Sequence, residues 1–184
     1  MGLSLESMAI VMPTVHGHPN RAGFRGVLTI VDVASDKSPS GARGHRVLLT
    51  RRAAEAAIPS LMGMGLDYSL ALDRHDAQRK IGVITRAEIV GRVIEVGGFL
   101  YARDFPEIVA EIGRPGRTGT SVSAGAGRNV PASRAGLGMS YEITDALVED
   151  IKASVWVLNR VTFTGAAVLR KDKAAYCSTW IELG

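Results

Sequence analysis

The sequence contains only one cysteine, Cys177, among its 184 residues, so the chain cannot form an internal disulfide bond. None of its apolar runs approaches the roughly 20 residues that a membrane-spanning helix requires. The first 13 residues include Glu6 and lack a basic leader before an apolar stretch, which argues against a signal peptide. Together these absences predict a protein that has no membrane partner and stays in the reducing compartment where it is made.

A concentrated basic surface is also missing. The 22 lysines and arginines outnumber the 18 acidic residues, for a net charge of +4, but they are spread over the whole chain. Aromatic residues, which stack on bases in many single-strand binders, make up only 5% of the sequence. This distribution argues against nucleic acid as a partner, although the arginines between positions 114 and 134 leave a basic nucleic-acid-binding module as an alternative.

Short strand-like runs dominate what the chain does contain. β-Branched and alternating patterns predict strands over residues 27–33, 45–49, 68–72, 81–89, 93–102, 139–144 and 154–163, with another at the C-terminal end. Helix formers predict short helices over 51–58 and 106–112, and a helical turn at 171–176. We therefore expect an α+β fold, in which a mostly antiparallel, small β-barrel-like sheet is flanked by two or three short helices.

The segment from Gly113 to Gly138 is the single low-complexity stretch. Glycine, serine, arginine and alanine dominate it, and it has almost no large apolar side chains with which to build a core. We expect a flexible loop at about 113–138, acting either as a lid or as a self-cleavage site. With no linker long enough to divide the chain, residues 1–184 are expected to form a single domain.

Two residues far apart in the sequence could together carry nucleophilic chemistry. The polar segment DRHDAQRK places His75 between Asp73 and Asp76, which can bias the tautomer of the imidazole. Ser140 follows small residues in GLGMSYEI, where backbone N–H groups can face a developing oxyanion. A serine hydroxyl needs a base to become a nucleophile, so Ser140 is informative only if His75 lies beside it.

Other reactive side chains are weaker candidates. His16 and His18 have a ligand-like spacing, but no third ligand is evident from the sequence. Cys177 is a lone thiol of the kind that more often packs in a core. The glycine-rich segment lacks the phosphate-binding pattern G-x-x-x-x-G-K-[ST]. We therefore expect neither a cofactor nor a metal.

Two long blocks of the sequence resemble the prohead proteases of tailed phages. The first is RHDAQRKIGVITRAEIVGRVIEVGGFLYARDFPEIVAEI, in which a histidine precedes a strand, a hairpin and a short helix. The second is GLGMSYEITDALVEDIKASVWVLNRVTFTGAAVLRKDKAAY, in which a G-x-S motif opens a strand and a later strand reads V-T-F. The blocks cover most of residues 50–176, and herpesvirus assemblins are more distant relatives with the same order of histidine and serine.

The resemblance implies a serine endopeptidase that acts in capsid maturation. His75 would be the general base and Ser140 the nucleophile. The substrates would be the phage scaffold, the major capsid protein and the enzyme itself, cut in the host cytoplasm inside the assembling prohead. An enzyme that works inside a shell could also form a homo-oligomer.

The third catalytic residue is where this sequence departs from the family pattern. Relatives carry an acid or a histidine on or near the strand that here reads SVWVLNRVTF, which has neither. Asp150, just before that strand, is the preferred residue, with Asn159 and Asp76 as alternatives. If none of these serves, the site is a dyad, or the chain is a catalytically inactive capsid-assembly or scaffold protein with the same fold.

Overall fold

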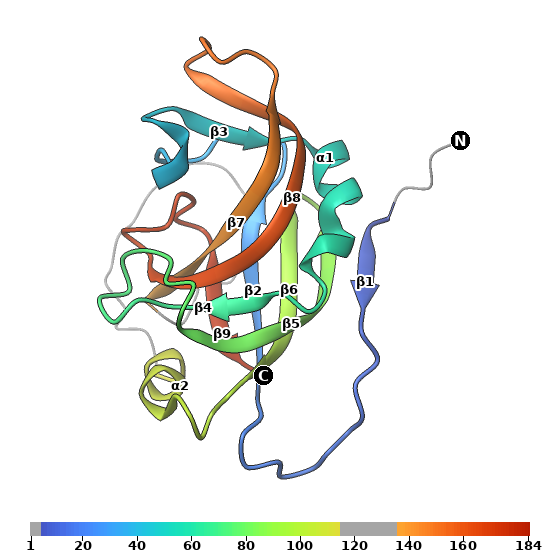
Figure 1. Cartoon of the computed structure of the whole chain (residues 1–184), viewed down its shortest axis with the longest axis vertical. Helices are drawn as coiled ribbons and strands as arrows, with labels where there is room; N and C mark the ends of the chain where they lie inside the picture. Colours follow the sequence, from blue (N-terminus) through green and yellow to red (C-terminus); the bar gives the residue numbers. More distant parts are fainter. Residues whose placement is uncertain (1–4, 115–135) are drawn as a thin grey trace.

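The computed structural model describes residues 5–114 and 136–184, in which nine strands form one curled sheet (Figure 1). The strands are β1 (Ser7–Ala9), β2 (Ala22–Ile30), β3 (Arg46–Leu49), β4 (Gly65–Asp67), β5 (Lys80–Val90), β6 (Val93–Leu100), β7 (Leu137–Val148), β8 (Val155–Arg170) and β9 (Trp180–Leu183). The helices are α1 (Arg51–Ala57) and α2 (Pro106–Ile112), with short 3₁₀ helices η1 (Ser40–Ala42) and η2 (Ile58–Leu61). None of the helices in these two ranges is long and apolar enough to cross a membrane.

The expected α+β class and mostly antiparallel sheet are wrong. Strands make up 45% of the described structure and helices 13%, so the protein is mostly β, and its mixed sheet curls into a half-barrel. Strands β3 and β4 both run parallel to β8, while β7 runs antiparallel to it. Helix α1 and the adjoining η2 connect β3 to β4 while the chain keeps its direction, and a pattern of apolar residues does not reveal that direction.

Strand β8 is the centre of the architecture. It is 16 residues long, and its residues from Leu158 to Arg170 pair with β7 in a hairpin that crosses the front of the sheet (Figure 1). Its side chains alternate between two faces, as a strand requires. A register shift against β7 at Thr164 interrupts this alternation once, so Phe163 belongs to the hydrophobic core together with Ala166 and Val168, whereas Gly165 and Ala167 lie on the opposite face. That second face becomes the floor of the candidate site.

The two predicted helices are confirmed, and their residues explain why they form. Thr50 caps α1 by accepting a hydrogen bond from the Ala53 N–H at 3.2 Å. Three alanines of α1 are buried (Ala53, Ala54 and Ala57), which lets the helix pack closely on β8. Helix α2 begins at Pro106, a position where the missing N–H has no cost.

Two local predictions differ from the structure in ways that affect the site. The chain turns at 68–72 instead of forming a strand, because β4 ends at Asp67 and Ser69 Oγ binds the carboxylate of Asp73 at 2.9 Å. The helical turn expected at 171–176 is limited to one turn, in which the N–H groups of Lys173 and Ala174 donate to the carbonyl of Arg170, and bends follow it. The expected loop at 113–138 falls mostly on residues 115–135, which lie outside the described residues.

Candidate functional site

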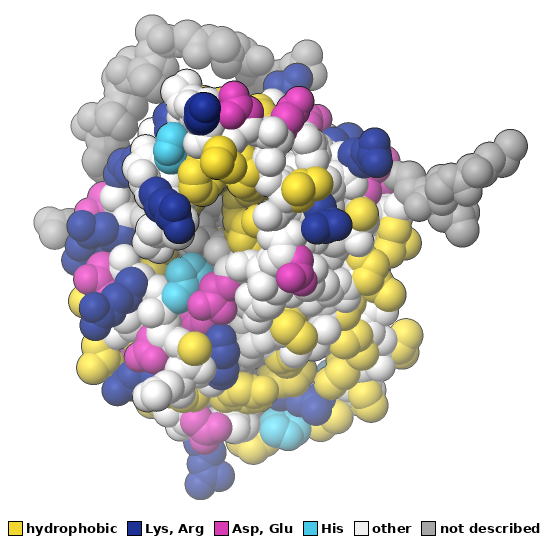
Figure 2. All heavy atoms as spheres, turned by 45° about the horizontal axis from the view of Figure 1, so that its top comes forward, with side chains coloured by type: hydrophobic (Ala, Val, Ile, Leu, Met, Phe, Trp, Pro, Cys, Tyr) yellow, Lys and Arg dark blue, Asp and Glu magenta, His cyan; other side chains and the backbone are white. Residues whose placement is uncertain are grey.

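A cavity of about 760 Å³ lies beside the β7–β8 hairpin, and both His75 and Ser140 line it. Ser140 comes from β7, and His75 comes from the turn that follows β4. The apolar part of the lining includes Val47, Val148 and Trp156. Figure 2 shows this hollow, with hydrophobic side chains along its wall and a histidine next to acidic side chains at its rim.

The imidazole of His75 faces two carboxylates. Its Nδ1 lies 3.3 Å from Glu142 Oε1 and 3.8 Å from Asp67 Oδ1. This nitrogen is buried, and it makes no hydrogen bond of normal geometry with a described group. Because Nδ1 is the buried nitrogen of a ring that still lines the cavity, Nε2 is the nitrogen available for chemistry there.

Asp67 is a fully buried carboxylate held by several donors. Lys80 Nζ donates to its Oδ2 at 2.9 Å, and the backbone N–H of Asp76 donates to its Oδ1 at 3.1 Å. Burial works to raise the pKa of the Asp67 carboxyl, but His75, Lys80 and the Asp76 N–H together outweigh it, and the pKa falls below its usual value. Asp67 is therefore ionised at neutral pH and contributes a fixed negative charge beside the imidazole.

The strand register explains how these groups meet. Ser140 on β7 lies opposite Ala167 on β8, and Ala167 lies opposite Asp67 on β4. Side chains that are directly opposite in neighbouring strands share one face of the sheet, so Ser140 and Asp67 flank the small Ala167 on the same face. Glu142, two residues after Ser140, points to that face as well.

Glycines make room for the charged cluster. A Cβ atom at Gly165 would lie 2.7 Å from Glu142 Oε2 and 3.6 Å from Lys80 Nζ. A Cβ atom at Gly65 would lie 2.7 Å from Lys80 Cδ. The Glu142 and Lys80 side chains thus lie over Gly165 and Gly65, and a side chain at either glycine would occupy the space that they fill.

The backbone of β7 offers a candidate oxyanion donor. The N–H of Met139 points away from β8 and donates to Thr179 Oγ1 at 3.1 Å, so it is already occupied. N–H groups two residues apart in an antiparallel strand point to the same edge, so the N–H of Tyr141 also points away from β8. Of the expected donors around Gly138–Tyr141, the N–H of Tyr141, directly after Ser140, is the best placed.

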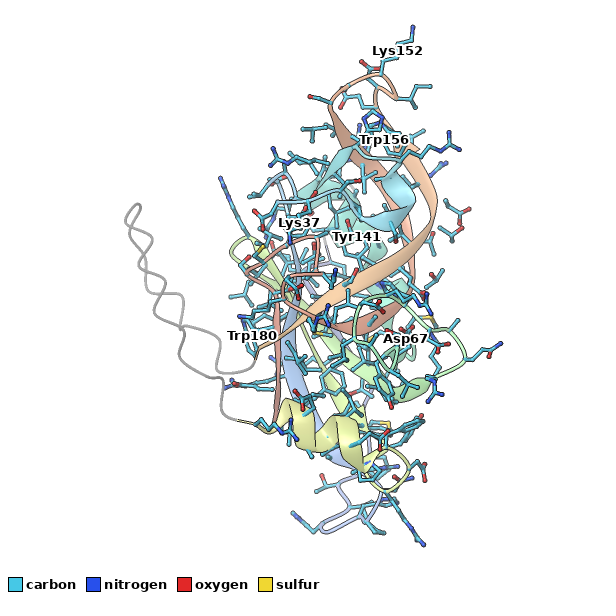
Figure 3. All side chains as sticks on the ribbon, turned by 90° about the vertical axis from the view of Figure 1, so that its left-hand side faces the viewer. Lys37, Asp67, Tyr141, Lys152, Trp156 and Trp180 are labelled. Atoms are coloured by element: carbon cyan, nitrogen blue, oxygen red, sulfur yellow. The ribbon has the colours of Figure 1, made fainter. Side chains whose placement is uncertain are left out.

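The structure brings together only some of the predicted site residues. His75 and Ser140 line one cavity, but no hydrogen bond joins them among the described residues. Asp150 lies in the exposed turn after β7, where its carboxylate accepts from the Lys152 N–H at 2.8 Å. Lys152 marks the tip of the hairpin, far from Asp67 in Figure 3. Asp150 does not line the cavity, and nothing in its surroundings supports the triad role that we predicted for it.

The two alternatives to Asp150 have other contacts. Asn159 is exposed and donates to Glu149 Oε2 at 3.3 Å. Asp76 pairs through its carboxylate with Arg79 at 3.4 Å, and only its backbone reaches the site, through Asp67. Neither side chain contacts the His75 ring.

Sequence reasoning missed both acids next to His75. Glu142 could have been found, because a strand that begins near Ser140 must carry residues 140 and 142 on one face. Asp67 gave no such signal, because it lies in a short strand whose parallel pairing with β8 is not evident from the sequence. The remaining candidates stay apart from the cavity: His18 Nδ1 accepts from the Asn20 N–H, and Cys177 is exposed.

Comparisons with known proteins found no protein-family model, curated protein or solved structure that matches the chain.

Proposed function

We propose that the protein is a serine endopeptidase of the prohead-protease type, with Ser140 as nucleophile and His75 as general base. The observation that carries the proposal is that a serine, an imidazole and a carboxylate (Ser140, His75 and Glu142) line one cavity, with the buried carboxylate of Asp67 beside the same imidazole. Its substrates would be scaffold and capsid segments of a tailed phage, cut inside the assembling prohead, as the sequence resemblance implies.

The arrangement of His75 supports the role of a base. A carboxylate on the Nδ1 side holds the proton on Nδ1, which leaves the lone pair of Nε2 free to accept the proton of Ser140. The Ser140 oxygen would then attack the peptide carbonyl, and the imidazole would pass the serine proton to the departing amine as the C–N bond breaks and the acyl-enzyme forms. Water, deprotonated by the same imidazole, would attack the acyl group, and the proton would return to Ser140 as the acid product leaves. Catalytic hydrogen bonds often form only when substrate is bound, so the lack of a His75–Ser140 hydrogen bond among the described residues does not count against these roles.

Glu142 replaces Asp150 in our proposal as the orienting acid. Its Oε1 is nearer to His75 Nδ1 than any oxygen of Asp67 that contacts the ring, at 3.3 Å against 3.8 Å. Asp67 is held by Lys80 and is better suited to fix the charge of the cluster. We assign it a supporting role.

The apolar wall of the cavity supports a preference among substrates. Val47, Val148 and Trp156 can take up an apolar side chain next to the bond to be cleaved. Trp156 is held in place by stacking on His45, with ring centroids 4.6 Å apart. We therefore expect cleavage beside aliphatic residues and not beside acidic ones.

A serine-reactive fluorophosphonate tests the nucleophile directly. We expect the purified wild-type chain to be labelled at Ser140, as located by peptide mass spectrometry, and Ser140→Ala to lose the label. His75→Ala should slow labelling by at least about 10²-fold, because the hydroxyl then lacks its base. Ser154→Ala, at an exposed serine outside the cavity, is the matched control and should label like the wild type.

Co-expression with the cognate scaffold and major capsid protein tests the substrates. The wild type should process them and Ser140→Ala should not. Normal processing by both Ser140→Ala and His75→Ala would overturn the proposal. Absence of both labelling and processing in the wild type would instead favour an inactive assembly protein.

A further inference from the structure

The acids around His75 also form a set of metal ligands. Asp67, His75 and Glu142 each present one ligand atom, and the three atoms lie within 4.8 Å of one another. We propose that these three side chains bind Zn²⁺ and that the bound ion switches off the hydrolase. The inhibitory part rests on the proposed function, whereas the binding part does not.

The spacing of the ligand atoms suits a small tetrahedral ion. Zn²⁺ binds nitrogen and oxygen at about 2.0–2.2 Å, which separates two tetrahedral ligands by roughly 3.3–3.5 Å. His75 Nδ1 is 3.3 Å from Glu142 Oε1 and 3.8 Å from Asp67 Oδ1. A shift of a few tenths of an ångström brings both of these pairs into range. The two carboxylate oxygens lie within 4.8 Å of each other, so the partly exposed Glu142 side chain must also turn toward Asp67 to complete the set. Water would take the fourth position.

The imidazole nitrogen at the centre of the set is short of a partner. His75 Nδ1 is buried and lacks a hydrogen bond of normal geometry, although most buried polar atoms have one. A neutral imidazole can satisfy this atom in two ways, by donating a proton to a carboxylate or by donating its lone pair to a metal. A nitrogen ligand also favours Zn²⁺ over Mg²⁺ and Ca²⁺, which prefer oxygen.

Lys80 sets the affinity of the site. Its Nζ lies 2.9 Å from Asp67 Oδ2 and 3.9 Å from Glu142 Oε2, whereas the other oxygen of each carboxylate faces His75. The ammonium therefore leaves the ligand atoms free but lowers the negative charge that attracts the ion. Removing the charge of Lys80 should strengthen zinc binding and so gives the proposal a variant with a gain of function.

Zinc at Nδ1 would remove the general base. With the metal on Nδ1, the single proton of the neutral ring must move to Nε2. Nε2 then has no lone pair with which to accept the proton of Ser140, so the serine stays protonated. No proton is gained or lost by the ring, and removing the metal restores the base.

Calorimetry with zinc sulfate on the full chain, stripped beforehand with a chelator, tests binding. We expect one Zn²⁺ per chain, affinity lower by at least about tenfold in Glu142→Gln, and higher affinity in Lys80→Met. Glu142 is partly exposed, so its substitution should leave the fold intact, which circular dichroism can check. His16→Ala, at an exposed histidine outside the cluster, should bind like the wild type.

The outcomes separate the two proposals. Equal zinc affinity in the wild type and Glu142→Gln, or loss of binding in His16→Ala, would overturn the zinc site. If zinc binds but fluorophosphonate labelling of Ser140 continues at the same rate, the inhibitory role is wrong. If the wild type is not labelled even without zinc, the hydrolase proposal and the inhibitory role both fail, while calorimetry still decides whether the site exists.

Discussion

The two carboxylates at His75 differ in their surroundings, and this should divide their roles. Glu142 is 28% exposed and reaches the ring from β7. Asp67 has a side chain with no exposure and is held by Lys80. A buried, paired acid contributes mainly to stability, whereas the nearer and more exposed acid is the one that can follow the ring in the reaction that we propose.

Replacing each acid by its amide should therefore have contrasting effects: one substitution should mainly lower kcat, and the other should mainly lower stability. We expect Glu142→Gln to lower kcat by about 10²–10⁴-fold, because an amide no longer stabilises the protonated imidazole. Asp67→Asn should lower kcat less but destabilise the fold by about 1–3 kcal/mol, since Lys80 loses its buried partner. Peptide hydrolysis and urea unfolding of both variants measure the contrast. The reverse ranking in kcat would make Asp67 the orienting acid.

The contribution of Asp67 to stability should depend on pH in one direction. Its pKa is lower in the folded chain than the value of about 3.9 expected when unfolded, so the unfolded chain binds the proton more tightly. The stabilisation is complete above pH about 4 and is lost as the pH falls through the lower, folded value. Urea unfolding of wild type and Asp67→Asn should differ most at neutral pH and converge in acid. A constant difference across the range would contradict the assignment.

At the residue level, sequence reasoning found the two residues that we propose as nucleophile and base, but not the acids beside His75. His75 and Ser140 belong to recognisable segments, and they do line one cavity. The preference for Asp150 rested on closeness in sequence to the strand SVWVLNRVTF. Because β7 and β8 are long, the turn between them is distant from the start of β7, where Ser140 lies.

At the level of the strands, the floor of the site is formed by the pairing of β4, β8 and β7. Parallel pairing of β4 with β8 and antiparallel pairing of β7 with β8 place three strands side by side, with small residues in the middle strand. Gly165 and Ala167 on β8 keep the space between Ser140 on one side and Asp67 on the other open. Charged side chains from the flanking strands can therefore meet across β8.

A methyl group at Gly165 should disturb the site without unfolding the chain. Its Cβ would lie 2.7 Å from Glu142 Oε2, the far end of a side chain that can move aside. We expect Gly165→Ala to lower kcat/KM by about 10²-fold, in line with the usual effect of misplacing a catalytic group by about 1 Å. Kinetics with a peptide substrate measure it. Gly136→Ala, where a Cβ meets nothing within 4 Å, is the control, and equal activity of both variants would show that Glu142 tolerates displacement.

Among the elements, those with strong local signals were predicted and those set by distant contacts were not. Helices α1 and α2 follow from their caps, alanines and proline. The strand expected at 68–72 is a turn, because the Ser69–Asp73 hydrogen bond closes it and Leu72 adopts a left-handed backbone with φ of 53°. Strand β1 was missed because its three residues are exposed and gain order only by pairing with β5.

For the molecule as a whole, β8 should control stability. It pairs with β3, β4 and β7, and its Phe163 is 1% exposed and packs edge-to-face on Tyr141 with centroids 5.7 Å apart. We expect Phe163→Ala to lower the free energy of unfolding by about 3–5 kcal/mol in urea denaturation. Ile151→Ala, at a 69% exposed position, should change it by less than about 0.5 kcal/mol. A similar small change for Phe163→Ala would place the core elsewhere.

The predicted α+β class was wrong because of how the helices and the sheet are arranged in the whole molecule. The helices are only seven residues each, and they lie beside a single sheet without forming a layer of their own. Short strands counted from sequence predict sheet content, but they do not tell which pairs run parallel. In this chain the parallel pairs determine where Asp67 lies.

Among the described strands, β7 forms a ladder only with β8. The edge of β7 that faces away from β8, toward which the Tyr141 N–H points, is therefore where a bound substrate peptide can form backbone hydrogen bonds. A target that binds there must first be extended, since backbone groups already committed to a helix or sheet have nothing to offer. The proposed endopeptidase should thus leave folded domains intact and cleave the linkers between them. The same cleavable peptide can be inserted either in a linker or within a stable helix of one test protein, and the fraction of each that is cut can be compared. Preferential cutting in the linker would show that selectivity comes from the local folding of the target as much as from its side chains.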